Sequence, residues 1–211
     1  MSVSVWLVIL VPLLLLGWLV SQAMPTPRDR QLQALRGRAR ALDLTVTLRS
    51  LDDPDPAPAE RVSSSGRPLE PKLSVAGYAR ALRPPSGLLP RAFPQWRVWW
   101  LRNRSGERHD EALPPGWRFD ARDHDLPLVD AVTQRLGELL QQVPEGTHCV
   151  EATGREVTLY WRERGDASEV DAIGAFLDGL RAFQIDLAER AGAEGPEDAA
   201  DDADAREDAA G

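Results

Sequence analysis

The chain has very few of the residues and motifs that carry chemistry. Cys149 is its only cysteine, which excludes an intramolecular disulfide and is consistent with a reducing compartment. The sequence contains no glycine-rich phosphate loop, no paired-cysteine metal motif, no His-Glu-x-x-His and no Gly-x-Ser-x-Gly. Because no catalytic or cofactor-binding motif is present, we expect no enzyme activity and no cofactor.

The folded part of the chain also lacks a basic excess. The formal net charge is −8. Residues 191–211 hold eight acidic residues and Arg206, a net charge of −7, which leaves −1 for residues 1–190. A nucleic-acid-binding domain normally carries a basic excess, so we expect no nucleic-acid partner. The acidic tail has too little apolar surface to order itself, and we predict that residues 191–211 are disordered.

One long apolar run is present instead. Residues 3–20 carry no charge, and a helix of this length rises about 27 Å, enough to cross the hydrocarbon core of a bilayer. No Lys or Arg precedes the run, whereas a signal peptide begins with a positively charged region. We therefore predict an uncleaved transmembrane helix at 3–20. The small-x-small triplet ending at Ala23 leaves open a cleaved form with a periplasmic domain.

Positive charge follows the apolar run. Six arginines lie between residues 28 and 49, against Asp29 and Asp43. Basic residues next to a transmembrane helix tend to stay in the cytoplasm. This pattern predicts a single-pass protein of the bacterial inner (cytoplasmic) membrane, with its N-terminus outside and its C-terminal domain in the cytoplasm. Its first partner would then be membrane lipid, through the anchor.

Residues 26–43 predict a basic juxtamembrane helix. Thr26 followed by Asp29 is a helix-capping pattern, and Pro27 suits the first turn. Apolar residues then recur at helical spacing. Some arginines of this helix are candidate contacts for anionic lipid head groups, each contributing about 1 kcal/mol: Arg28, Arg30, Arg36 and Arg40. The alternative is that these arginines only fix the topology.

The rest of the chain predicts an α+β domain. Residues 44–93 combine a strand at 44–48, Pro-rich loops and a second strand at 73–82. Residues 94–190 predict strands at 96–101 and 117–119, a helix at 128–143, a hairpin at 148–163 and a long helix that a capping pattern at Ser168 begins. We expect a small, mostly antiparallel sheet of four strands with two helices on one face.

The two faces of this sheet should differ. The alternation of strand side chains predicts one face buried under the helices: Trp96, Val98, Trp100, Val157, Leu159 and Trp161. The opposite face is a candidate interaction face: Arg97, Trp99, Tyr160 and Arg162. Aromatic and arginine side chains on an exposed sheet stack on bases or form hot spots for a protein partner. The alternative is that Trp99 and Tyr160 pack under residues 52–66 or under the juxtamembrane helix.

Two further groups contain chemically active side chains. His109 and His124 lie near several carboxylates in predicted loops, which leaves a metal-dependent hydrolase as an alternative function. Cys149 adjoins His148, but neighbours on a strand point to opposite faces and do not form a nucleophile–base pair. We expect Cys149 to be a small buried apolar residue.

Three stretches carry a family resemblance: "MPTPRDRQLQALRGRARALDL" after the apolar run, "LPPGWRF", and "TLYWRERGDASEVDAIGAFLDGL". With them the chain resembles uncharacterised, single-pass inner-membrane proteins of proteobacteria, sometimes labelled as accessory subunits of the preprotein translocase. The chain lacks the Gly-Asp-x-Val-x-Thr-x-Gly-Gly stretch of the true accessory subunit, so we do not transfer that function. Our hypothesis is a membrane-anchored, non-enzymatic domain that binds a protein partner at the cytoplasmic face, with the accessory-subunit function as an alternative.

Overall fold

The structure of this protein is a computed structural model that describes residues 10–16, 18, 26–63, 65–83, 90–101, 113–126 and 130–193. Within these residues the fold is α+β, as predicted, and contains a six-stranded sheet. The strands are β1 (Thr45–Asp52), β2 (Lys72–Ala81), β3 (Trp96–Trp100), β4 (Trp117–His124), β5 (Thr147–Ala152) and β6 (Glu156–Trp161). The main helices are α2 (Pro27–Ala41), α3 (Asp130–Leu140) and α4 (Ala167–Ala193).

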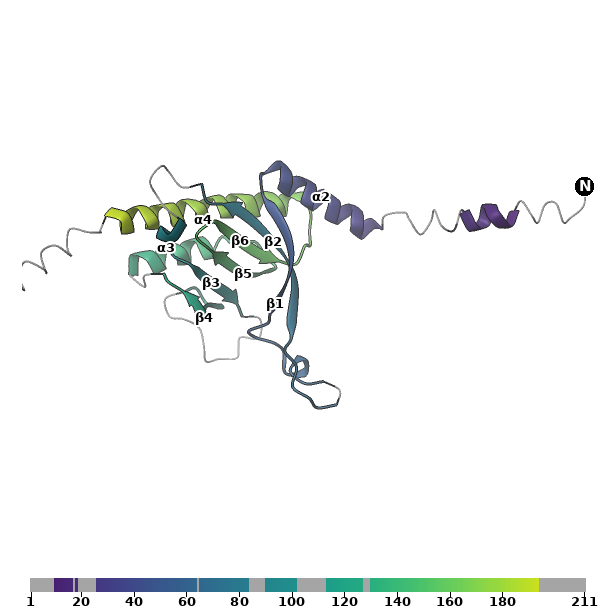
Figure 1. Cartoon of the computed structure of the whole chain (residues 1–211), viewed down its shortest axis with the longest axis horizontal. Coiled ribbons are helices and arrows are strands. Elements are labelled where there is room, and N and C mark those ends of the chain that lie inside the picture. Colours follow the sequence, from purple (N-terminus) through teal and green to yellow (C-terminus); the bar gives the residue numbers. More distant parts are fainter. Residues whose placement is uncertain are drawn as a thin grey trace, which may run out of the picture.

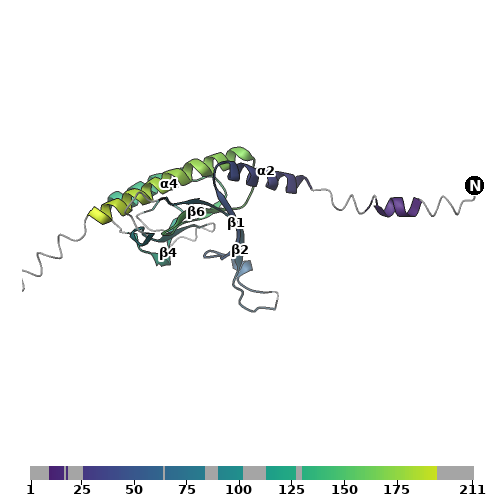
Figure 2. The ribbon, with the colours of Figure 1, turned by 45° about the horizontal axis from the view of Figure 1, so that its top comes forward.

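The sheet is antiparallel throughout, in the order β1-β2-β6-β5-β3-β4. The helices form a layer on one face of it (Figure 1), and the view in Figure 2 shows α4 running along this layer above the strands. The hairpin of β1 and β2 extends beyond the other strands (Figure 1). One face of the sheet is therefore covered by helices and the other is not.

The face under the helices holds the main hydrophobic core, as the alternation of side chains predicted. Trp96, Val98 and Trp161 are at most 1% exposed, and Val157 and Leu159 are fully buried. The strands and all three helices supply this core. Trp100, which was expected on the same face, is only partly buried and packs at the margin of the core.

The expected sheet of four strands with two helices was too small. β1 and β2 add two strands at one edge, where β2 pairs with β6. α2 is the third helix on the core face, since Leu35 and Ala39 are buried in the main core. The strand predicted at 73–82 is confirmed as β2. The segment at 26–83 is therefore part of the same core as residues 94–190.

Two helix starts can be compared with their capping patterns. α2 begins as predicted: the Thr26 side chain accepts the backbone N–H of Asp29, and the Asp29 carboxylate accepts the N–H of Thr26 at 2.9 Å. α4 begins one residue before the predicted cap. The carboxylate of Asp166, not the hydroxyl of Ser168, satisfies the helix start by accepting the N–H of Ser168 at 2.8 Å.

Both ends of the chain lie largely outside the described residues. Of the predicted transmembrane helix at 3–20, residues 10–16 and 18 are described, and they are helical and exposed. Among the described residues, no helix combines the length and apolar character that crossing a membrane requires. At the other end α4 continues to Ala193, so the first three residues of the predicted tail are helical; residues 194–211 lie outside the described part.

Candidate functional site

Three of the four residues of the predicted interaction face meet on the side of the sheet away from the helices. Arg97 lies between two carboxylates, with Nη2 at 2.5 Å from Glu151 and Nη1 at 3.5 Å from Asp120. The indole N–H of Trp99 donates to Asp120 at 3.1 Å, and the Tyr160 hydroxyl donates to Glu151 at 2.6 Å. The two aromatic rings are therefore held by the acids that also bind Arg97.

These two aromatic side chains are buried by packing and are not exposed to solvent. Trp99 is 5% exposed and Tyr160 is 4% exposed, in a second cluster with Leu73, Val75 and Cys149. The Tyr160 ring lies over Gly77 of β2, because a Cβ there would be 2.8 Å from its Cε1 atom. This geometry favours the alternative of structural packing over a stacking platform. The residues packed with them, Leu73, Val75 and Leu51, come from β1 and β2, and not from residues 52–66 or the juxtamembrane helix, where that alternative placed them.

The fourth residue, Arg162, is separate from this cluster. It follows β6, its side chain is exposed, and its backbone N–H donates to the carbonyl of Gly146 at 3.4 Å. Arg162 therefore lies at the end of the sheet, next to the connection between α3 and β5.

The arginines predicted to touch lipid divide into two pairs. Arg36 forms a two-pronged ion pair with Glu163, at 2.9 and 2.6 Å, and Arg28 donates to the backbone carbonyl of Glu163. The side chains of Arg30 and Arg40 are exposed. Two of the four thus fasten α2 to the segment after β6, whereas the other two stay accessible.

The groups considered for catalysis show no assembled site within the described residues. His109 lies outside them, and of His124 only the backbone is described, paired with Trp96. Cys149 is fully buried, and burial raises the pKa of its thiol well above the usual value. In the part of the chain that the structure describes, no three His, Cys, Asp or Glu side chains come together as a metal site.

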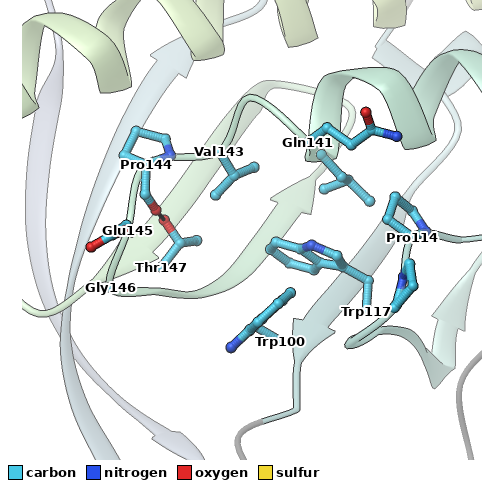
Figure 3. Close-up of a pocket in the computed structure, with 11 residues that line it drawn as sticks. Trp100, Pro114, Trp117, Gln141, Val143, Pro144, Glu145, Gly146 and Thr147 are labelled. Atoms are coloured by element: carbon cyan, nitrogen blue, oxygen red, sulfur yellow. Dashed lines mark hydrogen bonds between the residues drawn. The ribbon is translucent and has the colours of Figure 1, made fainter.

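A pocket of about 490 Å³ opens at one end of the sheet, on the helix side. Figure 3 shows Trp100 and Trp117 on one wall, with Val143, Pro144 and Thr147 across from them and Pro114 beside Trp117. Pockets of about 300–1,000 Å³ with apolar linings are typical ligand sites. The full lining is Trp100, Pro114, Pro115, Trp117, Leu140, Gln141, Val143, Pro144, Glu145, Gly146 and Thr147.

A tight turn builds the tryptophan wall. Pro115 and Gly116 occupy the middle of the turn, Gly116 has φ +96°, and the N–H of Trp117 donates to Pro114 at 3.1 Å. Proline at the second position, glycine with a positive φ at the third and this hydrogen bond are the features of a type II turn. Gly116 also lets Trp100 approach, because a Cβ there would be 2.8 Å from the indole ring. The two indoles pack edge to face, with centroids 5.5 Å apart.

The opposite wall comes from the end of α3. Pro144 cannot extend the helix, and its carbonyl accepts the hydroxyl of Thr147 at 2.8 Å. Gly146 has φ +80°, a backbone conformation that favours glycine. These two features turn the chain sharply into β5 and leave Val143 and Pro144 facing the indoles (Figure 3).

The pocket lies at the end of the sheet to which the start of α2 is attached. Thr147 pairs with Trp161 in β6, two residues before Glu163. Glu163 in turn binds Arg36 and Arg28, and Gln31 donates to the carbonyl of Gly165. The first half of α2 is thus attached at the pocket end of the sheet.

In comparisons with known proteins, no family model, no curated protein and no solved structure matches this chain.

The sequence indicates the separate parts of the pocket, but its local patterns do not show that these parts meet. The Pro-Pro-Gly-Trp sequence is typical of a turn, the proline after α3 suits the end of the helix predicted at 128–143, and Trp100 was expected in a buried face. They lie far apart in the chain, and only the pairing of β3 with both β4 and β5 brings them together.

Proposed function

We propose that this protein is a non-enzymatic, membrane-anchored domain that binds a partner protein through the pocket between Trp100, Trp117 and Val143. The observation that carries the proposal is the pocket itself, in which the partly buried Trp100 packs against the more deeply buried Trp117 beside apolar side chains. Tryptophan is enriched among the residues that dominate binding at protein interfaces. Leu140 and Thr147 complete a mostly apolar site whose geometry two turns and a helix end fix in advance.

The anchor belongs to the same proposal. Residues 3–20 would cross the bacterial inner membrane once, with the N-terminus outside and the folded domain in the cytoplasm. The exposed apolar side chains from Leu10 to Leu16 support this, because a contiguous exposed apolar stretch is typical of contact with a membrane or a partner. Arg30 and Arg40 are the arginines free to meet anionic head groups, since Arg28 and Arg36 bind Glu163.

The position of the pocket fits an anchored binding domain. It lies at the end of the sheet to which the first half of α2 is attached. A partner held there would sit near the membrane surface, which suits another membrane protein.

Co-isolation from crosslinked cells tests this function. Glu145→Arg changes an exposed residue of the pocket rim, and Glu189→Arg makes the same change on the exposed face of α4. Tagged full-length chains are crosslinked in the native host, extracted in detergent and purified. We expect the wild-type protein and the Glu189 variant to recover the same partner, and the Glu145 variant to recover at least about fivefold less, a loss of about 1 kcal/mol.

Two results of this experiment would contradict the proposal: a wild-type protein without a specific partner, or equal recovery with all three chains. Recovery of translocase subunits by the wild-type protein would favour the accessory-subunit alternative.

A further inference from the structure

We infer that the Trp100–Trp117 pocket recognises an extended, proline-containing segment that carries a basic residue. The inference rests on the proposed function and names the chemistry of the partner. It follows from three properties of the described lining: its flat apolar walls, its supply of hydrogen-bond donors, and the negative charge of Glu145.

The apolar walls suit proline rings. The two indoles face Val143 and Pro144 across the pocket, and Pro114 extends the indole wall (Figure 3). Proline-rich segments bind in aromatic-lined grooves because they are already extended and lose little conformational entropy on binding. A pocket formed by short turns, which cannot fold around a ligand, favours an occupant that is itself already ordered.

The hydrogen-bond donors of the pocket match the carbonyl acceptors of a proline-rich segment. A proline residue has a carbonyl oxygen and no N–H, so a proline-rich backbone presents many acceptors and few donors. In the part of the chain that the structure describes, the indole N–H groups of Trp100 and Trp117 have no acceptor, whereas that of Trp99 donates to Asp120. The amide of Gln141, exposed on the rim, adds further donors.

The charge of the rim selects a basic residue. Among the described residues that line the pocket, Glu145 is the only charged one, and it is exposed. An Arg or Lys of the partner next to the proline would lie within reach of this carboxylate. Complementary charges of this kind add specificity and speed association more than they add affinity.

The geometry disfavours a quaternary ammonium ion as the occupant. Such cations bind over several open aromatic faces. Here the two indoles meet at 67°, edge to face, and Gly116 lies against the ring of Trp100. Each indole therefore covers part of its neighbour, and the pair presents one wall rather than a box.

Binding of dye-labelled peptides to the purified full-length chain in detergent tests the inference, with fluorescence anisotropy as the signal. The probe is a peptide pool with two fixed prolines three residues apart and a fixed Arg, the other positions being random. We expect saturable binding, at least about tenfold weaker when both prolines are replaced by alanine. Glu145→Arg should weaken binding of the Arg pool and strengthen binding of a matched Asp pool, whereas Glu189→Arg should change neither.

Several outcomes would overturn this inference. They are no binding of the proline pool, equal binding of the alanine pool, or displacement of the peptide by tetramethylammonium. If one of these occurs while the partner recovered from cells still depends on Glu145, the pocket binds a partner of another chemistry and the proposed function stands. If the cellular partner is also independent of Glu145, both claims fail.

Discussion

The protein is expected to lose up to about 6 kcal/mol of folding stability as the pH rises from about 9 to about 11, because three buried groups must stay protonated in the folded state. Tyr78 is fully buried and donates to Glu163 at 3.1 Å, and Tyr160 donates to Glu151 at 2.6 Å. Burial, and then the neighbouring carboxylate, raises the pKa of both tyrosines above the usual 10.0. Burial likewise raises the pKa of Cys149 above its usual 9.0.

The sign of the effect follows from proton binding. Above the usual pKa the unfolded chain releases these protons while the folded chain keeps them, so stability is fully present below that pH and falls as the pH rises. Each pH unit costs about 1.4 kcal/mol per group. At about pH 11 the two tyrosines together lower the free energy of unfolding by up to about 3 kcal/mol, and Cys149 lowers it by a similar amount. Folded domains have only about 5–15 kcal/mol to lose.

Urea unfolding at several pH values, together with phenolate absorbance, measures this effect. Tyr78 and Tyr160 are the only tyrosines, and Lys72 is the only lysine, so few other groups titrate in this range. Phenolate should appear only as the protein unfolds. Tyr78→Phe, Tyr160→Phe and Cys149→Ala should each flatten the fall of stability with pH. Phenolate absorbance at about pH 10 in a protein that remains folded would show that these tyrosines are not buried as described.

Replacing Glu163 with alanine is expected to lower the free energy of unfolding by about 2–3 kcal/mol. Glu163 is 7% exposed and accepts from Arg36 and from the hydroxyl of Tyr78. The substitution leaves that buried hydroxyl without its acceptor and Arg36 without its ion pair. Because Arg36 is 31% exposed, water recovers part of its loss, and the expected effect stays below that of a fully buried pair.

A second ion pair on the same helix provides the control. Arg38 binds Asp171 at 2.7 Å, but the two side chains are 44% and 46% exposed. Asp171→Ala should cost less than about 0.5 kcal/mol, because exposed ion pairs contribute little. Equal effects of the two substitutions in urea unfolding would contradict the view that Glu163 fastens α2 to the sheet.

Local patterns predicted most of the elements. The capping of α2 by Thr26 and the Pro-Gly turn before β4 depend on residues within a few positions of each other, and both are present. The core face was also predictable, because Trp96 and Val98 alternate with polar positions on one strand.

The remaining features of the fold depend on pairing between strands that lie far apart in the sequence, so they could not be predicted from local patterns. β1 is the edge strand of the sheet and is exposed along most of its length. Its sequence therefore does not indicate that it pairs with β2, or that β2 in turn pairs with β6. The sequence left open whether Trp99 and Tyr160 form an interaction face or are packed, since the residues that pack there, Leu73 and Val75, come from a strand some 25 residues before β3 in the sequence. The pocket required three segments to meet, which no local pattern encodes.

A fusion experiment tests the proposal that the chain is anchored in the membrane with its folded domain in the cytoplasm. A fluorescent protein that matures only in the cytoplasm is fused to Gly211, and its fluorescence and size are followed through membrane fractions. We predict a bright, full-length fusion that leaves the membrane only in detergent, and a bright soluble fusion when residues 3–20 are deleted. A dark fusion shortened by about 23 residues, as cleavage after Ala23 would give, would contradict the claim.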